Sequence, residues 1–236
     1  MNKLVVFDFG ETLAYYGGTR LSWSEHYEDA LQYSANLQDF QFNRDSLIEA
    51  QERLEHYNTR SNPRLKEVTS KEIFGEIADN LGPQTNLDRF VSGFFMYFKR
   101  NIIVYDETIT VLRELQSLSV HTAILTDMPY GMDTYLLLED LESTGIDKYI
   151  EQILSSVDVG YRKPDKRGLL NVLERFGIDK ADTIFVGNEL KDIECAHNAG
   201  VEGVLLERGD KNSFNLEFDY EIINSLSEVL PLISGT

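Results

Sequence analysis

Short apolar runs and segments of helical periodicity alternate along most of this chain. The runs at residues 4–7, 120–125, 183–186 and 203–206 are four to six residues long and predict buried strands, and residues 149–155 predict another. Between them, the spacing of apolar side chains predicts helices at 107–118, 135–141, 164–176, 192–200 and 225–232. Strands that alternate with helices predict a parallel, doubly wound sheet.

From about residue 22 to residue 100 the pattern is helical. Apolar side chains recur every three or four residues in four segments, at 23–34, 47–54, 73–81 and 87–98. Thr69 and Glu72 form a capping box before the third segment, and Gly82 ends it. Four amphipathic helices with short connections predict a bundle. Residues 14–18, which precede it, predict a tight hairpin or flap.

The composition narrows the possible partners. The 236 residues include 22 Lys and Arg and 40 Asp and Glu, a net charge of −18, which disfavours nucleic acids and anionic membranes. No apolar run is long enough to span a membrane, and the first strand leaves no room for a signal peptide. Cys195 is the only cysteine, which favours a reducing compartment. We therefore expect a cytoplasmic monomer or homodimer that acts on a small molecule.

Asp8 is the first candidate for chemistry. It follows the apolar run 4–7 and is followed at once by the turn residue Gly10, so it lies at the carboxyl end of a predicted strand. Open α/β sheets place their ligands at that edge. A buried carboxylate is costly unless it is paired or bound to a metal, which favours a functional role. The alternative is that Asp8 caps the next segment.

Three further segments carry polar residues at comparable places. The strand at 120–125 ends in Thr126 and Asp127, and Lys163 lies just before an expected helix. The strand at 183–186 is followed by Asn188 and, four residues later, by Asp192. In this order and spacing, the chain resembles the haloacid dehalogenase-like hydrolase superfamily. The resemblance implies a Rossmann-like core of residues 1–14 and 101–236, with an α-helical bundle, residues 15–100, inserted as a cap domain.

The resemblance also implies a covalent mechanism. Asp8 matches the nucleophile, which becomes an aspartyl intermediate, and Thr12 matches the residue that fixes the following turn. Thr126 matches the hydroxyl that binds a phosphoryl oxygen, and Lys163 matches the cation beside the nucleophile and the phosphate. A carboxylate that attacks an anionic phosphate needs such positive charge. The implied activity is that of a phosphatase on a small phosphate ester.

A magnesium ion is the implied cofactor. In the family it is held by the nucleophile, by the backbone carbonyl two positions later and by acidic residues of the last motif, which correspond to Asp8, Gly10, Asn188 and Asp192. Magnesium prefers oxygen ligands and keeps several waters, so one or two carboxylates suffice. Asn188 stands where the family usually has Asp, and its carbonyl oxygen carries no charge. We therefore expect magnesium to bind, but weakly.

The candidates for substrate binding come from two places. Thr126, Asp127 and Lys163 belong to the motifs. The others follow the first motif most closely and belong to the region that would close over the sheet edge. They are Tyr15, Tyr16, Arg20 and His26.

Gly10 is the main departure from the family pattern. Phosphatases of this family carry an Asp here as the general acid that protonates the leaving oxygen. A positioned acid contributes roughly 10²–10⁴-fold to the rate, so its loss should cost about 3–5 kcal/mol of barrier. Glu11 is the nearest substitute, although neighbouring side chains of an extended chain point to opposite sides.

Three function classes follow from these matches and departures. The first is the magnesium-dependent phosphatase. The second is a metal-independent hydrolase of carbon–halogen or other C–X bonds, whose leaving halide needs no proton. Family members of that kind lack the second Asp, but this chain does not reproduce their aromatic residue at position 10. The third is a binding module that keeps the fold and has weakened or lost turnover.

Overall fold

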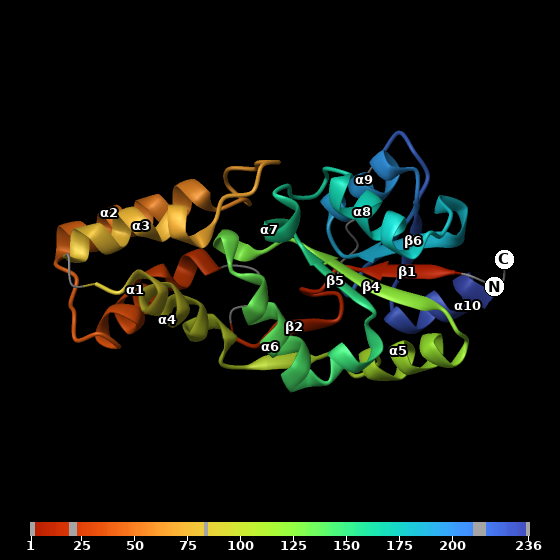
Figure 1. Ribbon diagram of the computed structural model, residues 1–236, viewed down its shortest axis with the longest axis horizontal. Coiled ribbons are helices and arrows are strands. Elements are labelled where there is room, and N and C mark those ends of the chain that lie inside the picture. Colours follow the sequence, from red (N-terminus) through yellow and green to blue (C-terminus); the bar gives the residue numbers. More distant parts are fainter. Residues whose placement is uncertain (1–2, 19–22, 83–84, 210–215, 235–236) are drawn as a thin grey trace.

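The computed structural model of the chain describes residues 3–18, 23–82, 85–209 and 216–234. Figure 1 shows two lobes, one made of helices and the other of a twisted sheet with helices on both faces. No helix within these ranges is both long and apolar enough to cross a membrane.

The large sheet has six parallel strands, with β1 in its interior. In spatial order the strands are β5 (Gln152–Ser155), β4 (His121–Thr126), β1 (Leu4–Phe7), β6 (Thr183–Gly187), β7 (Glu202–Leu206) and β8 (Glu221–Ile223). Leu4 pairs with His121 on one side and with Thr183 on the other, so the three motif-bearing strands are neighbours. The predicted parallel, doubly wound α/β sheet is confirmed, although β8 was not predicted.

Helices cover both faces of this sheet (Figure 1). One face carries α5 (Thr108–Ser117), α6 (Thr134–Thr144) and α10 (Val229–Ser234). The other carries α7 (Ser156–Val159), α8 (Arg167–Phe176) and α9 (Leu190–Ala199). The connections include the 3₁₀ turns η2 (Pro129–Gly131), η3 (Ile146–Tyr149), η4 (Lys180–Asp182) and η5 (Leu226–Glu228).

The side chains of β1 belong to two different hydrophobic clusters. Val5 and Phe7 belong to the larger cluster, whereas Leu4 and Val6 belong to the smaller one, because alternate side chains of a strand point to opposite faces. All four are fully buried. Burial on both faces explains why this strand is an uninterrupted apolar run.

The other lobe is an aromatic-rich helical bundle. Its elements are η1 (Trp23–His26), α1 (Tyr27–Asn36), α2 (Arg44–Tyr57), α3 (Ser70–Leu81) and α4 (Leu87–Lys99). The capping box of Thr69 and Glu72 before α3 is confirmed. Phe90, Phe94 and Phe98 of α4 are buried in its centre, at the spacing that the sequence predicted.

The predicted hairpin at residues 14–18 is wrong. Ala14–Tyr16 forms β2, which pairs in antiparallel fashion with β3, Ile102–Val104, on the far side of the helical region. The tight turn comes earlier, where the Glu11 amide donates to the Ala14 carbonyl at 2.8 Å. The chain therefore leaves and re-enters the sheet lobe through adjacent strands. The domain boundaries at 14/15 and 100/101 stay a prediction.

Two helix starts also differ from the predicted ones. The helix expected from residue 164 begins at Arg167, because the Asp165 amide donates to the Arg162 carbonyl at 2.9 Å and closes a turn first. The helix expected from residue 192 already begins at Leu190. The changed helix starts alter the placement of charged residues near the site, because both helices carry charged residues at their starts.

Candidate active site

The end of β1 places Asp8 inside the protein. Its amide donates to the Val186 carbonyl of β6 at 2.8 Å, so the ladder of the sheet fixes the backbone on which the carboxylate stands. Asp8 is only 5% exposed. Directly after it, the Leu13 amide donates to the Phe9 carbonyl at 2.9 Å and turns the chain back.

Lys163 joins two buried carboxylates. Its ammonium nitrogen lies 2.5 Å from Asp8 Oδ1 and 2.6 Å from Asp192 Oδ1. Burial raises the pKa of Asp8 to about 6; Asp192 adds to the rise and Lys163 opposes it. Burial lowers the pKa of Lys163, but the carboxylates, Asp192 and Asp8 foremost, outweigh it and hold that pKa well above its usual value. Lys163 is therefore a permanent cation between the two acids.

Asp192 is held at the start of α9. Its Oδ2 accepts a hydrogen bond from the Glu189 amide at 2.9 Å, and the whole residue is fully buried. A Cβ added to Gly187 would lie 2.4 Å from this carboxylate. Glycine at the end of β6 is thus what lets Asp192 approach Lys163.

Thr12 and Asn188 link two of the motifs. The Thr12 hydroxyl donates to Asn188 Oδ1 at 3.2 Å, which ties the turn after β1 to the turn after β6. Thr12 is fully buried. Thr126, at the end of β4, is 6% exposed and lines the same cavity as Asp8 and Lys163.

Asp127 faces the basic residues around it. Its Oδ1 accepts from the Lys163 amide at 3.0 Å, and its Oδ2 lies 3.4 Å from Lys191 Nζ and 3.8 Å from the Arg162 guanidinium. Burial raises the pKa of Asp127, but Arg162, Lys163 and Lys191 outweigh it and hold that pKa below its usual range. The ionised carboxylate thus positions the backbone of Lys163.

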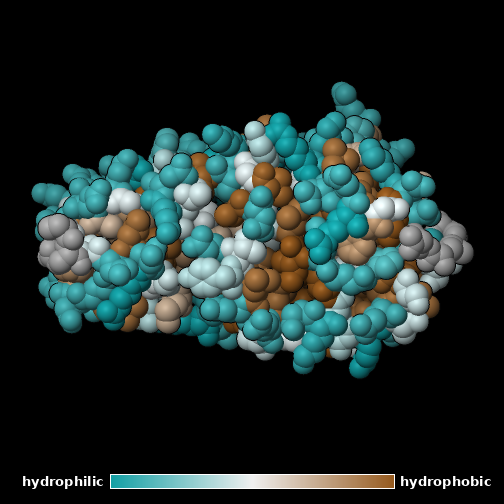
Figure 2. All heavy atoms as spheres, in the orientation of Figure 1, coloured by the Kyte–Doolittle hydropathy of each residue, from teal (hydrophilic) through white to brown (hydrophobic). Residues whose placement is uncertain are grey.

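A cavity of about 820 Å³ lies over these motifs and is lined by residues of both lobes. Figure 2 shows hydrophobic atoms gathered at the waist between the lobes. Among the predicted site residues, those lining the cavity are Asp8, Gly10, Tyr15, Tyr16, Thr126, Asp127, Lys163 and Asn188. His26 is not among the described lining residues and contacts Tyr97 instead. Arg20 lies outside the described residues.

A family model described as haloacid dehalogenase-like hydrolase matches residues 42–206. The chain belongs to this family. The chain is 29% identical over 133 residues to a glyceraldehyde 3-phosphate phosphatase of Methanocaldococcus jannaschii, covering 56% of this chain and 57% of that one. It is 31% identical over 124 residues to a phosphoglycolate phosphatase of Escherichia coli K12, covering 52% and 48%. The chain thus spans about half the length of the curated relatives it matches.

Solved structures share the fold. A 2-haloacid dehalogenase from Pseudomonas syringae superposes with a TM-score of 0.71 at 21% identity, over 100% of this chain and 99% of that one. A HAD phosphatase from Thermococcus onnurineus gives a TM-score of 0.66 at 22% identity, over 99% and 98%. At these identities the likeness shows the fold alone. The predicted superfamily is confirmed.

Gly10, at the position where the sequence resemblance predicts a general acid, carries no side chain. No described heavy atom lies within 4 Å of the point where a Cβ of Gly10 would stand. Glu11 has a left-handed backbone, with φ of 59°, and its Oε2 accepts from the Tyr105 hydroxyl at 2.8 Å. The Arg208 guanidinium donates to the carbonyls of Glu11 and Thr12, at 3.2 and 3.0 Å. Glu11 is therefore held in the turn by groups on both its side chain and its backbone.

Further charged residues at the site come from both lobes; of these, the sequence pointed to Glu189 as a possible cation ligand and missed the others. Glu189 lies 2.8 Å from Lys191 and 3.2 Å from Arg60 of the helical lobe. Arg162 pairs with Glu67, also of the helical lobe, at 2.5 Å. Arg162 and Lys191 each stand beside a predicted site residue in the sequence, which is the only signal that could have found them.

Proposed function

We propose that the chain hydrolyses small phosphate esters through a covalent intermediate on Asp8. The observation that carries this proposal is the buried pair of carboxylates, Asp8 and Asp192, on either side of the Lys163 ammonium. A carboxylate nucleophile attacking a phosphate needs a fixed cation beside it, because both reactants are negative. The phosphatase names of the curated relatives support the same reaction class.

In the first step, an Asp8 oxygen bonds to phosphorus while the bond from phosphorus to the leaving oxygen breaks. The leaving oxygen departs with the electron pair and takes a proton from solvent. Lys163 and the Thr126 hydroxyl bind phosphoryl oxygens and stabilise the charge that spreads over them. Water then attacks the phosphorus of the intermediate, phosphate leaves, and the proton of the water passes to solvent. This restores the Asp8 carboxylate.

The oxygen donors predicted for this site would suit a magnesium ion. The predicted donors are all oxygen atoms, from the carboxylates of Asp8 and Asp192, the side chain of Asn188 and the carbonyl of Gly10, which is the donor set that magnesium prefers. Within the described ranges, no group of three or more His, Cys, Asp or Glu gathers as a metal site. Two carboxylates with neutral oxygens are consistent with weak binding. When bound, the ion would neutralise phosphoryl charge.

The helical region 15–100 would act as a cap over the sheet edge. The pairing of Arg60 with Glu189 and of Glu67 with Arg162 supports this, because both pairs join the helical lobe to loops that carry site residues. A closed cap excludes water and strengthens electrostatic interactions within the site. Asp127 would act by positioning Lys163. A cytoplasmic location agrees with the single, buried Cys195, and the assembly as monomer or homodimer stays a prediction.

A second candidate function is hydrolysis of a C–X bond without a metal. The observation that favours it is the missing acid at Gly10, since a halide leaves without a proton. Release of phosphate from p-nitrophenyl phosphate, with and without magnesium, separates the candidates when it is measured beside release of chloride from 2-chloropropionate. We expect magnesium-stimulated phosphate release and no chloride. Chloride release without magnesium would favour the second candidate, and no turnover of either compound would leave a binding module.

A further inference from the structure

The acidic side chains that line the cavity are poorly placed to protonate a leaving group. Gly10 has no side chain, and Glu11 accepts from Tyr105. Asp127 accepts from the Lys163 amide and lies 3.4 Å from Lys191. Glu189 lies 2.8 Å from Lys191 and 3.2 Å from Arg60, so both carboxylates already face basic groups. Among the described residues that line the cavity, Glu194 of α9 is the remaining acid, and it is tested below.

Without an acid, the leaving oxygen must depart as an anion. A phenolic oxygen does this readily, since a phenol such as the tyrosine side chain loses its proton near pH ~10. Water, whose oxygen is comparable to that of a simple alcohol, keeps its proton up to about pH 15.7. The chemistry at Gly10 therefore selects for a stabilised leaving group such as a phenolate.

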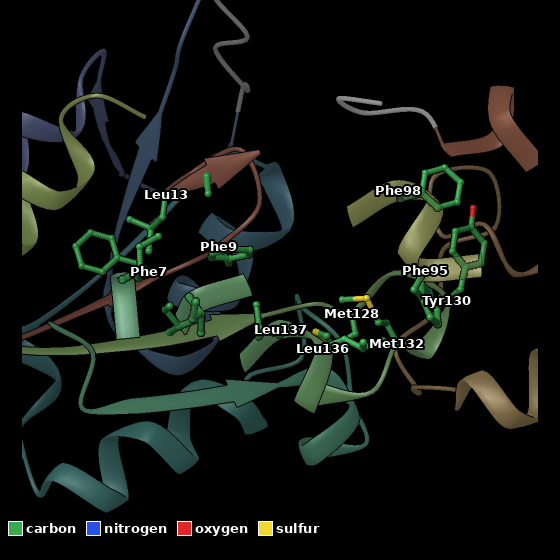
Figure 3. Packing of buried hydrophobic residues seen from close by; sticks show 14 of the residues in the cluster. Phe7, Phe9, Leu13, Phe95, Phe98, Met128, Tyr130, Met132, Leu136 and Leu137 are labelled. Carbon is green, nitrogen blue, oxygen red and sulfur yellow. The ribbon is translucent and has the colours of Figure 1, made fainter. Parts of the chain in front are cut away.

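The cavity is lined by charged residues near the motifs, and one part of its wall, toward the bundle, is aromatic and apolar. Trp23 stacks on Phe98, with ring centres 4.0 Å apart and planes parallel, and its ring lies 6.0 Å from that of Tyr130. Trp23 and Tyr130 line the cavity, as do Met128 and Met132 from the segment after β4. Figure 3 shows Met128 and Met132 between Phe9 and the bundle residues Phe95 and Phe98, with Tyr130 beside those two phenylalanines. Rings and thioethers of this kind favour contact with another aromatic ring.

The size of the cavity also favours a ligand that is larger than a phosphoryl group. About 820 Å³ lies within the range of pockets that enclose drug-sized ligands, and a phosphoryl group fills only a small part of it. Trp23 is only partly buried, whereas Tyr130 is 8% exposed, so a short polar leaving group would leave part of the Trp23 ring uncovered. A ring that reaches from Asp8 to the bundle would cover it.

We propose that the leaving group is aromatic, so that the substrate is an aryl phosphate whose ring packs against Trp23, Tyr130 and the two methionines. This inference rests on the proposed phosphatase function and adds the class of substrate. Two unrelated features of the site, the missing acid and the aromatic wall, select the same leaving group.

Four probes separate the two requirements. Phenyl phosphate has a ring and a good leaving group, benzyl phosphate a ring and a poor one, acetyl phosphate a good leaving group without a ring, and ethyl phosphate neither. We expect kcat for phenyl phosphate to exceed that for benzyl phosphate by about 10²-fold or more, the range of a missing acid. We expect the two ring compounds to have KM values about tenfold below the other two, because they bury apolar surface.

The outcomes distinguish this inference from the function on which it rests. No phosphate release from any probe by folded protein would reject the phosphatase. Turnover of all four without preference for phenyl phosphate would overturn the aryl substrate and leave the phosphatase standing. A selective loss of activity toward benzyl phosphate in Glu194→Gln would identify an acid and also overturn the inference.

Variants test the wall directly. Trp23→Leu should raise KM for phenyl phosphate about tenfold and raise it less for acetyl phosphate. Tyr135→Leu is the matched control, because Tyr135 is 48% exposed on α6 and is not among the described lining residues. If circular dichroism shows that Trp23→Leu has lost helix, Tyr15→Leu, which changes a lining residue outside the bundle, is measured in its place. Equal KM changes for both probes would contradict the proposed ring site.

Discussion

The hydroxyl of Thr12 donates a hydrogen bond to the side-chain oxygen of Asn188 across 3.2 Å, although the two residues are 176 positions apart. This contact fixes how the turn after β1 meets the turn after β6. The same Asn188 oxygen is the one that could face a cation, and an oxygen that already accepts one hydrogen bond has one lone pair left. Thr12 thus affects both the turn after Asp8, the proposed nucleophile, and the proposed metal site.

The first prediction concerns this metal site. Asn188→Asp should lower the magnesium dissociation constant by about tenfold, because the ion gains a charged ligand in place of a neutral one. Isothermal calorimetry on the intact protein measures it. Asn80→Asp adds the same charge at an exposed position of α3 and should leave the constant unchanged. If both variants bind as the wild type does, Asn188 is not a ligand.

The second prediction concerns the nucleophile. Asp8→Asn should reduce phosphate release at least about 10³-fold, because an amide cannot form the covalent intermediate. Asp106→Asn, at an exposed position between β3 and α5, is the matched control and should keep full activity. Thermal unfolding must show that both variants are folded. An Asp8→Asn protein that retains most of its turnover would remove Asp8 from the mechanism.

The third prediction concerns Asp127 and pH. Its pKa is held low in the folded state, so its ionisation stabilises the fold above the unfolded-state pKa of about 3.9 and this contribution is lost as pH falls through the folded-state value. Asp127→Asn should therefore lower the free energy of unfolding at pH 7 and at pH 5 by a similar amount. Below pH ~4 the difference should shrink.

Urea unfolding at each pH measures this difference. The expected loss at neutral pH is about 3 kcal/mol, the low end of the range for breaking a buried ion pair, because the amide can still accept from the Lys163 amide. Asp165→Asn, a partly exposed aspartate before α8, serves as control and should change stability less. A loss that does not depend on pH would mean that the charge of Asp127 contributes nothing.

The sheet could be predicted from the sequence because its strands are buried on both faces. Leu4 and Val6 pack on one side of β1 and Val5 and Phe7 on the other, so the strand is visible as an apolar run. The confirmed capping box at Thr69 has a local hydrogen-bond pattern, which sequence spacing also reveals. Such features depend on neighbours along the chain.

The pairing of β2 with β3 depends on distant residues. Tyr15 pairs with Ile103 across the whole helical region, and nothing in residues 14–18 distinguishes that strand from a hairpin. The same holds for Arg60 and Glu189, whose contact needs the two lobes to be in place. Residues at the ends of predicted parallel strands could be placed together in advance, whereas partners brought in by the bundle could not.

The last prediction concerns Gly10. Gly10→Asp should raise kcat for benzyl phosphate by about 10²-fold, the contribution of a positioned acid, and change phenyl phosphate much less, because a phenolate scarcely needs the proton. The fold should tolerate the change, since Gly10 is outside the left-handed region and no described heavy atom lies within 4 Å of the added Cβ. Gly10→Asn is the matched control, with the same shape but no acid, and should give no gain. Equal gains on both esters, or none with the fold intact, would contradict a missing acid and favour a reaction whose leaving group departs unprotonated.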